Sequence, residues 1–213
     1  MASEINICNL ALAHLGDTAT IASLSPPEGS AQAEHCARFY PVARDSLLEM
    51  HPWGFATKRV QLALLTSGWP EWTYAYAQPA DALNVIAILP PESTDDYSTG
   101  VPDSAGGSYV PQPFSCEIND SGAPVIYTDQ ADAVLRYSAT VTDPTSFSPL
   151  FVMALSWHLA SMLAGPIIKG DAGAAEAKRC AGMMQAYLSK AVESDSSQRR
   201  VRPEHVVGWM AGR

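Results

Sequence analysis

Residues 148–163, SPLFVMALSWHLASML, decide how this chain folds. Ser148 is a favoured helix N-cap, and Pro149 stands at the first helical position, where its missing N–H is tolerated. Residues 150–163 are then apolar on almost every side. A helix without a polar face must lie at the centre of a domain or beneath a partner. We therefore expect this helix, with Phe151 and Trp157, to provide apolar area for a core or for lateral packing between subunits.

Two helices are predicted near the N-terminus, because apolar residues recur there at helical spacing. The first begins after a Ser3 cap and ends at Gly16. The second begins at Ser30 and extends to about residue 50, and Pro41 inside it predicts a kink or a break into two shorter helices. The residues expected on the buried sides are Ile5, Cys8, Leu12, Leu15, Ala33, Cys36, Ala37, Tyr40, Leu47 and Leu48.

A fourth helix is predicted after the central one. Gly165-Pro166 is expected to end the helix of residues 150–163, and Asp171 to cap the next helix. The buried stripe of that last helix is expected to contain Ala177, Cys180, Ala181, Met184, Leu188 and Ala191.

Between residues 55 and 141 the apolar period changes from 3.6 to 2, which predicts strands. Turn residues separate six candidates, at residues 56–65, 74–78, 83–89, 114–118, 124–128 and 133–141. Short connections between successive strands favour an antiparallel sheet. Residues 90–113 lack periodicity, and form either a disordered surface loop or a loop that orders against a neighbouring subunit.

These elements predict an α+β fold. Residues 1–54 and 142–196 would form a four-helix bundle, and residues 55–141 an antiparallel β insertion between its second and third helices. Residues 197–213 would form an extended C-terminal tail.

The tail combines arginines with an apolar cluster that contains Trp209, and Trp and Arg are residues enriched at binding hot spots. A chain end frays by default, but a cluster of this kind also suits a peptide that docks on a neighbouring protein. The candidate docking residues are Arg199, Arg200, Arg202, Val206, Val207, Trp209 and Met210.

Charge argues against nucleic-acid binding. Charged residues make up only 16% of the chain, against roughly 25% in ordinary soluble domains, and this favours an assembly subunit. The net charge is −9; the tail holds four arginines and one glutamate, or +3, which leaves −12 on the body. DNA affinity needs basic residues that neutralise phosphates. We also expect no membrane-spanning run and no secretory signal, and hence a chain made in a cytosol.

No catalytic motif, cofactor or metal site is predicted. The sequence has no phosphate-binding glycine loop, nucleophile elbow or HExxH helix. His35 and Cys36 are adjacent on a helix and point about 100° apart, so they do not form a catalytic pair. The four cysteines are far apart in sequence and favour structural thiols over zinc ligands. Asp95-Asp96 and Asp129 to Asp132 suit turns better than a cation site.

Four blocks of the sequence resemble one family. They are EINICNLALAHLGD (4–17), AEHCARFYPVARDSLLEMHPWGFATKRVQLA (33–63), YAYAQPADALNVI (74–86) and VLRYSATVTDPTSFSPLFVMALSWHLASMLA (134–164). In this order they resemble the tail tubular protein A family of short-tailed bacteriophages, the head-to-tail adaptors. The resemblance covers most of residues 4–193. It departs at Pro41, which interrupts a helix expected to be continuous, and it does not extend to the loop of residues 90–113 or to the basic tail.

The resemblance implies a structural virion protein that forms a homo-oligomeric ring, expected to contain twelve copies, beneath the portal protein. The lower face of the ring would take the tail nozzle protein. Genomic DNA would leave through the centre without specific binding, and assembly would take place in the bacterial cytoplasm. No catalytic residue carries over from the family.

Three alternatives remain from the sequence. A neck or head-completion connector of a long-tailed phage would share the ring but not the large β region. A small prophage-encoded hydrolase would use Cys36 or Cys116 as nucleophile, and a DNA-binding packaging factor would need more basic charge.

Overall fold

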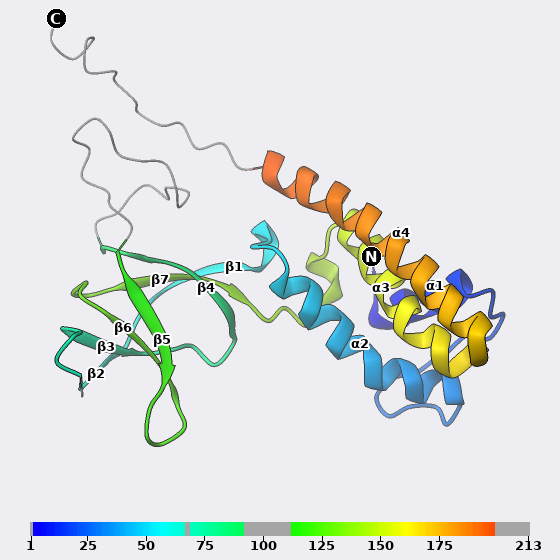
Figure 1. Ribbon diagram of the computed structural model, residues 1–213, viewed down its shortest axis with the longest axis horizontal. Helices are drawn as coiled ribbons and strands as arrows, with labels where there is room; N and C mark the ends of the chain where they lie inside the picture. Colours follow the sequence, from blue (N-terminus) through cyan, green and yellow to red (C-terminus); the bar gives the residue numbers. More distant parts are fainter. Residues whose placement is uncertain (1, 67–68, 92–111, 199–213) are drawn as a thin grey trace, which may run out of the picture. The chain divides into compact units, whose positions relative to one another are not determined.

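The computed structural model describes residues 2–66, 69–91 and 112–198, and the fold is α+β. The described residues form four α-helices and two antiparallel sheets (Figure 1). The chain divides into two compact units. The helical unit contains Met1–Ala56 and Thr140–Gln198, and the strand unit contains Thr57–Ala139.

The helical unit contains four α-helices and two short 3-10 turns. The helices are α1 (Glu4–His14), α2 (Ala31–Glu49), α3 (Pro149–Ile168) and α4 (Gly170–Ser197). The turns are η1 (Gly54–Ala56) and η2 (Pro144–Ser146). The three predicted serine caps are confirmed, because the hydroxyls of Ser3, Ser30 and Ser148 each accept a hydrogen bond from the backbone N–H three residues later.

Helix α3 packs against each of the other three helices, as its apolar composition requires (Figure 1). It is 20 residues long with a mean hydropathy of 1.6, so the expectation that no apolar run reaches membrane-spanning length is wrong by length and composition. Half of that apolar window is buried inside the protein. The contacts with α1, α2 and α4 bury that half of α3.

Proline does not break helices where the sequence predicts a break. Helix α2 is continuous through Pro41, whose side chain is exposed. Pro41 has no N–H to donate to the carbonyl of Ala37, but Tyr40 and Ala43 on either side of it are buried as parts of one helix. The predicted break into two shorter helices at Pro41 is therefore wrong.

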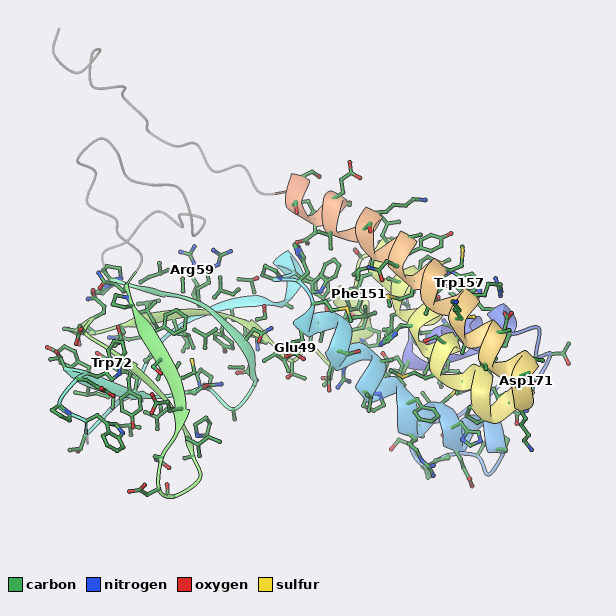
Figure 2. The ribbon with its side chains drawn as sticks, in the orientation of Figure 1. Glu49, Arg59, Trp72, Phe151, Trp157 and Asp171 are labelled. Atoms are coloured by element: carbon green, nitrogen blue, oxygen red, sulfur yellow. The ribbon has the colours of Figure 1, made fainter. Side chains whose placement is uncertain are left out.

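The boundary between the last two helices is also displaced from its prediction. Helix α3 continues through Gly165 and Pro166 to Ile168, and Asp171 lies in the first turn of α4 rather than at its cap (Figure 2). Lys169, with φ of +62°, makes the corner, and its side chain does not cap α4. Close packing holds the extra turn: a Cβ on Gly173 would lie 3.0 Å from the backbone oxygen of Ala164.

The strand unit contains seven strands in two sheets rather than one. The three-stranded sheet has the order β1-β7-β4 and the four-stranded sheet the order β2-β3-β6-β5, all pairs antiparallel. The strands are β1 (Thr57–Gln61), β2 (Leu64–Leu65), β3 (Tyr74–Ala77), β4 (Ala82–Leu89), β5 (Phe114–Ile118), β6 (Pro124–Thr128) and β7 (Val134–Ala139).

The predicted strand of residues 56–65 is divided between the two sheets. Leu62, between β1 and β2, is buried, and its N–H donates to the carbonyl oxygen of Ala133 at 2.9 Å. The chain thus leaves one sheet and enters the other at this residue. Both sheets contribute to one apolar core, whose buried members are Leu62, Tyr76, Ile88, Ile126, Ala133, Leu135, Tyr137 and Ala139.

Candidate assembly interface

Phe151 of α3 is fully buried in an aromatic cluster of the helical unit. Its ring centroid lies 5.0 Å from that of Trp53, 5.2 Å from Phe55 and 4.9 Å from Phe147. The indole N–H of Trp53 donates to the backbone oxygen of Leu47 at 2.8 Å, so the cluster is fixed to the end of α2. Phe151 therefore packs the core of its own unit.

Trp157 of α3 is only 8% exposed and lies between two other helices (Figure 2). The imidazole of His14 from α1 stacks on its indole, and the guanidinium carbon of Arg179 from α4 lies 5.2 Å from the ring centroid. Arg179 also donates to the backbone oxygen of His14 at 3.1 Å and pairs with Glu176. Core packing or lateral packing between subunits was expected for Phe151 and Trp157. The contacts described here are core packing within the helical unit.

The predicted docking tail lies outside the described residues. This applies to all seven of its candidates, Arg199, Arg200, Arg202, Val206, Val207, Trp209 and Met210, and its docking role stays a prediction.

The last turns of α4 are tied to the corner that follows α2. One carboxylate oxygen of Asp195 lies 3.2 Å from Nε2 of His51, and both oxygens accept the backbone N–H of Gly54 at 3.1 Å. His51 also packs edge-on against Trp53, with ring centroids 4.8 Å apart. The HPWG segment is thus held by a side chain from the far end of the sequence.

A half-buried histidine joins α2 to α3. Nε2 of His158 lies 3.0 Å from the hydroxyl of Ser46, which itself donates to the carbonyl oxygen of Ala43. The hydroxyl must then accept the imidazole N–H, which assigns the proton to Nε2. Nδ1 of His158 is buried without a hydrogen-bond partner among the described residues, and burial lowers the pKa of this imidazole.

The structure brings together two cysteines that are distant in sequence. Cys8 of α1 and Cys36 of α2 are both fully buried and hydrogen-bonded to one another, and both are reduced. The hydrogen bond to Cys36, together with burial, raises the pKa of the Cys8 thiol far above its usual range. The thiol of Cys36 therefore has a thiol neighbour, and the pair packs α1 against α2 as small apolar groups do.

Charged side chains span the three-stranded sheet. Lys58 on β1 donates to Asp81, which precedes β4, at 2.7 Å, and the hydroxyl of Tyr137 on β7 donates to the other carboxylate oxygen at 3.0 Å. The hydrogen bond from Lys58 is the main cause that lowers the pKa of Asp81. One carboxylate thus links all three strands of this sheet.

Large apolar side chains are exposed at the opposite edges of the four-stranded sheet. Leu64 on the edge strand β2 is 63% exposed, and Ile118 on the other edge strand, β5, is 73% exposed. Leu65 of β2 and Trp69 are exposed as well. Exposed apolar residues gathered at one element mark an interaction surface more often than scattered ones do.

Among the candidate cation ligands within the described residues, Asp129 binds Thr73, the residue that precedes β3. One oxygen of Asp129 accepts both the backbone N–H and the hydroxyl of Thr73, at 2.9 and 2.8 Å, and these bonds lower the pKa of Asp129. Within residues 2–66, 69–91 and 112–198, no three His, Cys, Asp or Glu side chains gather as a metal site. Asp95 and Asp96 lie outside this part.

Comparison of the chain with known protein-family models gives no match, and a comparison with curated proteins gives none either.

Proposed function

We propose that this chain is a structural subunit of a bacteriophage particle, the head-to-tail adaptor that forms a ring between the portal and the tail nozzle. The ring would contain twelve copies, and DNA would pass through its centre during ejection. The sequence blocks that resemble the tail tubular protein A family support this assignment, because they extend over both the helical and the strand segments in the family's order.

The observation that carries the proposal is the exposure of Leu64 and Ile118 at opposite edges of one sheet. A closed ring is built from heterologous contacts, in which one side of each subunit meets the other side of the next. Such contacts need two different interaction surfaces on one chain, one for each neighbouring subunit. The two edges of the four-stranded sheet meet this requirement.

The proposal includes the finer arrangement expected from the sequence: a four-helix bundle from which the β region emerges as an insertion between α2 and α3. It is supported by the grouping of Met1–Ala56 with Thr140–Gln198 in one unit. The central α3, which packs on α1, α2 and α4, would hold the two ends of the chain together.

The acidic body supports a conduit rather than a DNA-binding role. Outside residues 197–213 the chain carries a net charge of −12. Like charge discourages adhesion of phosphates to the wall of a channel. The packaging-factor alternative is therefore disfavoured by charge.

Negative-stain imaging with light scattering tests the proposal. The purified chain, alone and mixed with the portal protein of the same virus, is expected to form closed rings with a central channel, and with the portal a stacked double ring. A chain that remains monomeric in both samples would rule out the adaptor function. Rings that bind no portal would favour another ring-forming role.

A further inference from the structure

The backbone of the two outer strands of the four-stranded sheet has unused hydrogen-bonding groups directed outward. In antiparallel pairs, hydrogen-bonded and non-hydrogen-bonded residues alternate. Asn119 donates to Ala123 at 2.9 Å, so by the β5–β6 register the groups of Phe114, Cys116 and Ile118 point away from β6. No described strand pairs with β5 on that outer side.

By the same alternation, one residue of β2 has its backbone N–H and C=O directed away from β3. The N–H of Ala77 donates to the carbonyl oxygen of Ala63 at 3.0 Å, and the next pair in the register is Leu64 with Tyr76. The N–H and C=O of Leu64 therefore point away from β3. Within the described chain, β2 is the other edge of this sheet.

The edges of the other sheet carry features that prevent further pairing. Natural edge strands are protected by charged side chains and by β-bulges. Strand β1 presents Lys58 and Arg59, and β4 has register shifts between Ala82 and Asn84 and between Val85 and Ala87. Strands β2 and β5 pair without register shifts, and Glu117 is their single charged side chain.

The number of strands decides which sheet can continue from one copy to the next. In a sheet of four alternating strands, β2 and β5 run in opposite directions, so β5 of one copy can pair antiparallel with β2 of the next. In the three-stranded sheet, β1 and β4 run in the same direction, and the same head-to-tail contact would be parallel, which is the less stable pairing.

The side chains also match in this junction. Leu64, Tyr76, Ile126 and Cys116 are successive cross-strand partners and therefore lie on one face of the sheet. If Cys116 lies opposite Leu64 of the next copy, this row of side chains continues across the junction. The outward-pointing backbone groups of the two residues can then hydrogen-bond to each other, and the exposed Leu64 side chain is covered. Ile118 then lies diagonal to that leucine. Glu117 falls opposite Ala63, so like charges do not meet.

From this geometry we propose that copies of the chain associate head to tail by pairing β5 with β2 of the neighbouring copy, with Cys116 opposite Leu64. The inference deepens the proposed function, on which it rests for closure into a ring: it identifies the two surfaces that form the lateral contact. A second copy of the chain is the occupant of each edge.

A single substitution tests this register. Leu64→Cys places a thiol opposite the native thiol of Cys116 in the next copy, within reach of a disulfide. Within one chain the two positions are separated by three strand spacings, about 14 Å, against a limit of roughly 7 Å between Cα atoms. Oxidation with copper phenanthroline is therefore expected to give a ladder of covalent oligomers on a non-reducing gel, and dithiothreitol should collapse the ladder to monomer.

Matched variants control for chance encounters. Leu65→Cys places its thiol on the opposite face of β2 and is expected to give no ladder, and neither is the double variant Leu64→Cys/Cys116→Ser. Because Leu64 is 63% exposed, its replacement is expected to leave the melting temperature of the chain unchanged.

The outcomes separate this interface from the ring itself. A ring in light scattering with no ladder from Leu64→Cys would overturn the β5–β2 contact and leave the adaptor function standing. A band at dimer size alone in the oxidised wild type would indicate two-fold β5–β5 pairing and would also overturn it. A monomer in every experiment would remove both proposals.

Discussion

The imidazole of His14 in α1 stacks face to face on the indole of Trp157 in α3, with ring centroids 3.6 Å apart and planes 5° from parallel. Nε2 of His14 lies 3.0 Å from the hydroxyl of Ser156, which donates to the carbonyl oxygen of Met153 and so accepts the imidazole N–H. Burial, and then the nearby Arg179 guanidinium, lower the pKa of His14. Its surroundings therefore favour the neutral form of His14.

Acidification is expected to destabilise the helical unit through His14 and His158. The pKa values of both are below the ordinary 6.5. Below pH 6.5 the unfolded chain therefore takes up protons that the folded chain does not yet bind. The histidine contribution to the free energy of unfolding is then fully present above pH 6.5 and is lost as the pH falls through the folded pKa values. Thermal unfolding followed by circular dichroism across this range measures the loss.

Glutamine provides the control for this pH effect, because its amide keeps an N–H donor but does not titrate. The double variant His14→Gln/His158→Gln is expected to lose about 1 kcal/mol or more at neutral pH, and to show a flatter dependence on pH below 6.5. Equal slopes for the variant and the wild type would assign the acid sensitivity to other groups.

Asp195→Ala is expected to lower the free energy of unfolding by about 1–3 kcal/mol, because it leaves the N–H of Gly54 and the imidazole of His51 without their acceptor. Asp195→Asn retains an oxygen that can accept from Gly54 and should cost less. Glu193→Ala, an exposed position on the same helix, is the matched control. Chemical denaturation measures all three, and equal stability of the Asp195 and Glu193 variants would show that the tie is not stabilising.

Phe151→Ala is expected to cost about 3–5 kcal/mol, the range for removal of a buried aromatic ring. The cavity would open beside Trp53, Phe55 and Phe147. Val42→Ala, at an exposed position of α2, should be nearly neutral. If Phe151→Ala instead left the melting temperature unchanged and weakened only self-association, the residue would belong to a lateral contact.

Local chemistry explains why much of the fold was predictable from the sequence. Ser3, Ser30 and Ser148 cap helices because the cap needs only a hydroxyl and the next three residues. Gly16 follows the first helix with a positive φ that glycine adopts without strain. The α+β class and strands β3, β5 and β6 were predictable in the same way, from the alternation of apolar residues and from the turn residues between strands.

Tertiary packing determined what the sequence did not reveal. Helix α3 continues through Pro166 because its last turn is packed against α4 at Gly173. The division of strands between two sheets depends on pairings such as Thr57 with Ser138, which period-2 patterning cannot specify. The burial of Cys8 and Cys36 was predictable, because both residues lie on predicted buried stripes. Their contact with each other was not, because it depends on how α1 packs against α2.

Duplex DNA is expected to bind weakly and without a steep dependence on salt. Affinity for DNA falls with salt in proportion to the number of phosphates that the protein neutralises, and the body of the chain carries −12. Fluorescence anisotropy with a labelled duplex, at low and at physiological salt, measures this. Tight binding at physiological salt would contradict a passive conduit and favour the packaging-factor alternative.

Deletion of residues 206–213 is expected to weaken assembly without lowering the melting temperature of the monomer. The deleted segment contains Val206, Val207, Trp209 and Met210, which suit a hot spot on a partner better than an exposed chain end. Trp209→Ala should reproduce much of the defect, because a buried indole dominates such contacts. Light scattering and portal co-sedimentation read out assembly, and calorimetry reads out folding. A truncated chain that unfolds at lower temperature would instead place the segment in the monomer's own structure, and the ring contact would then have to be formed by the folded units.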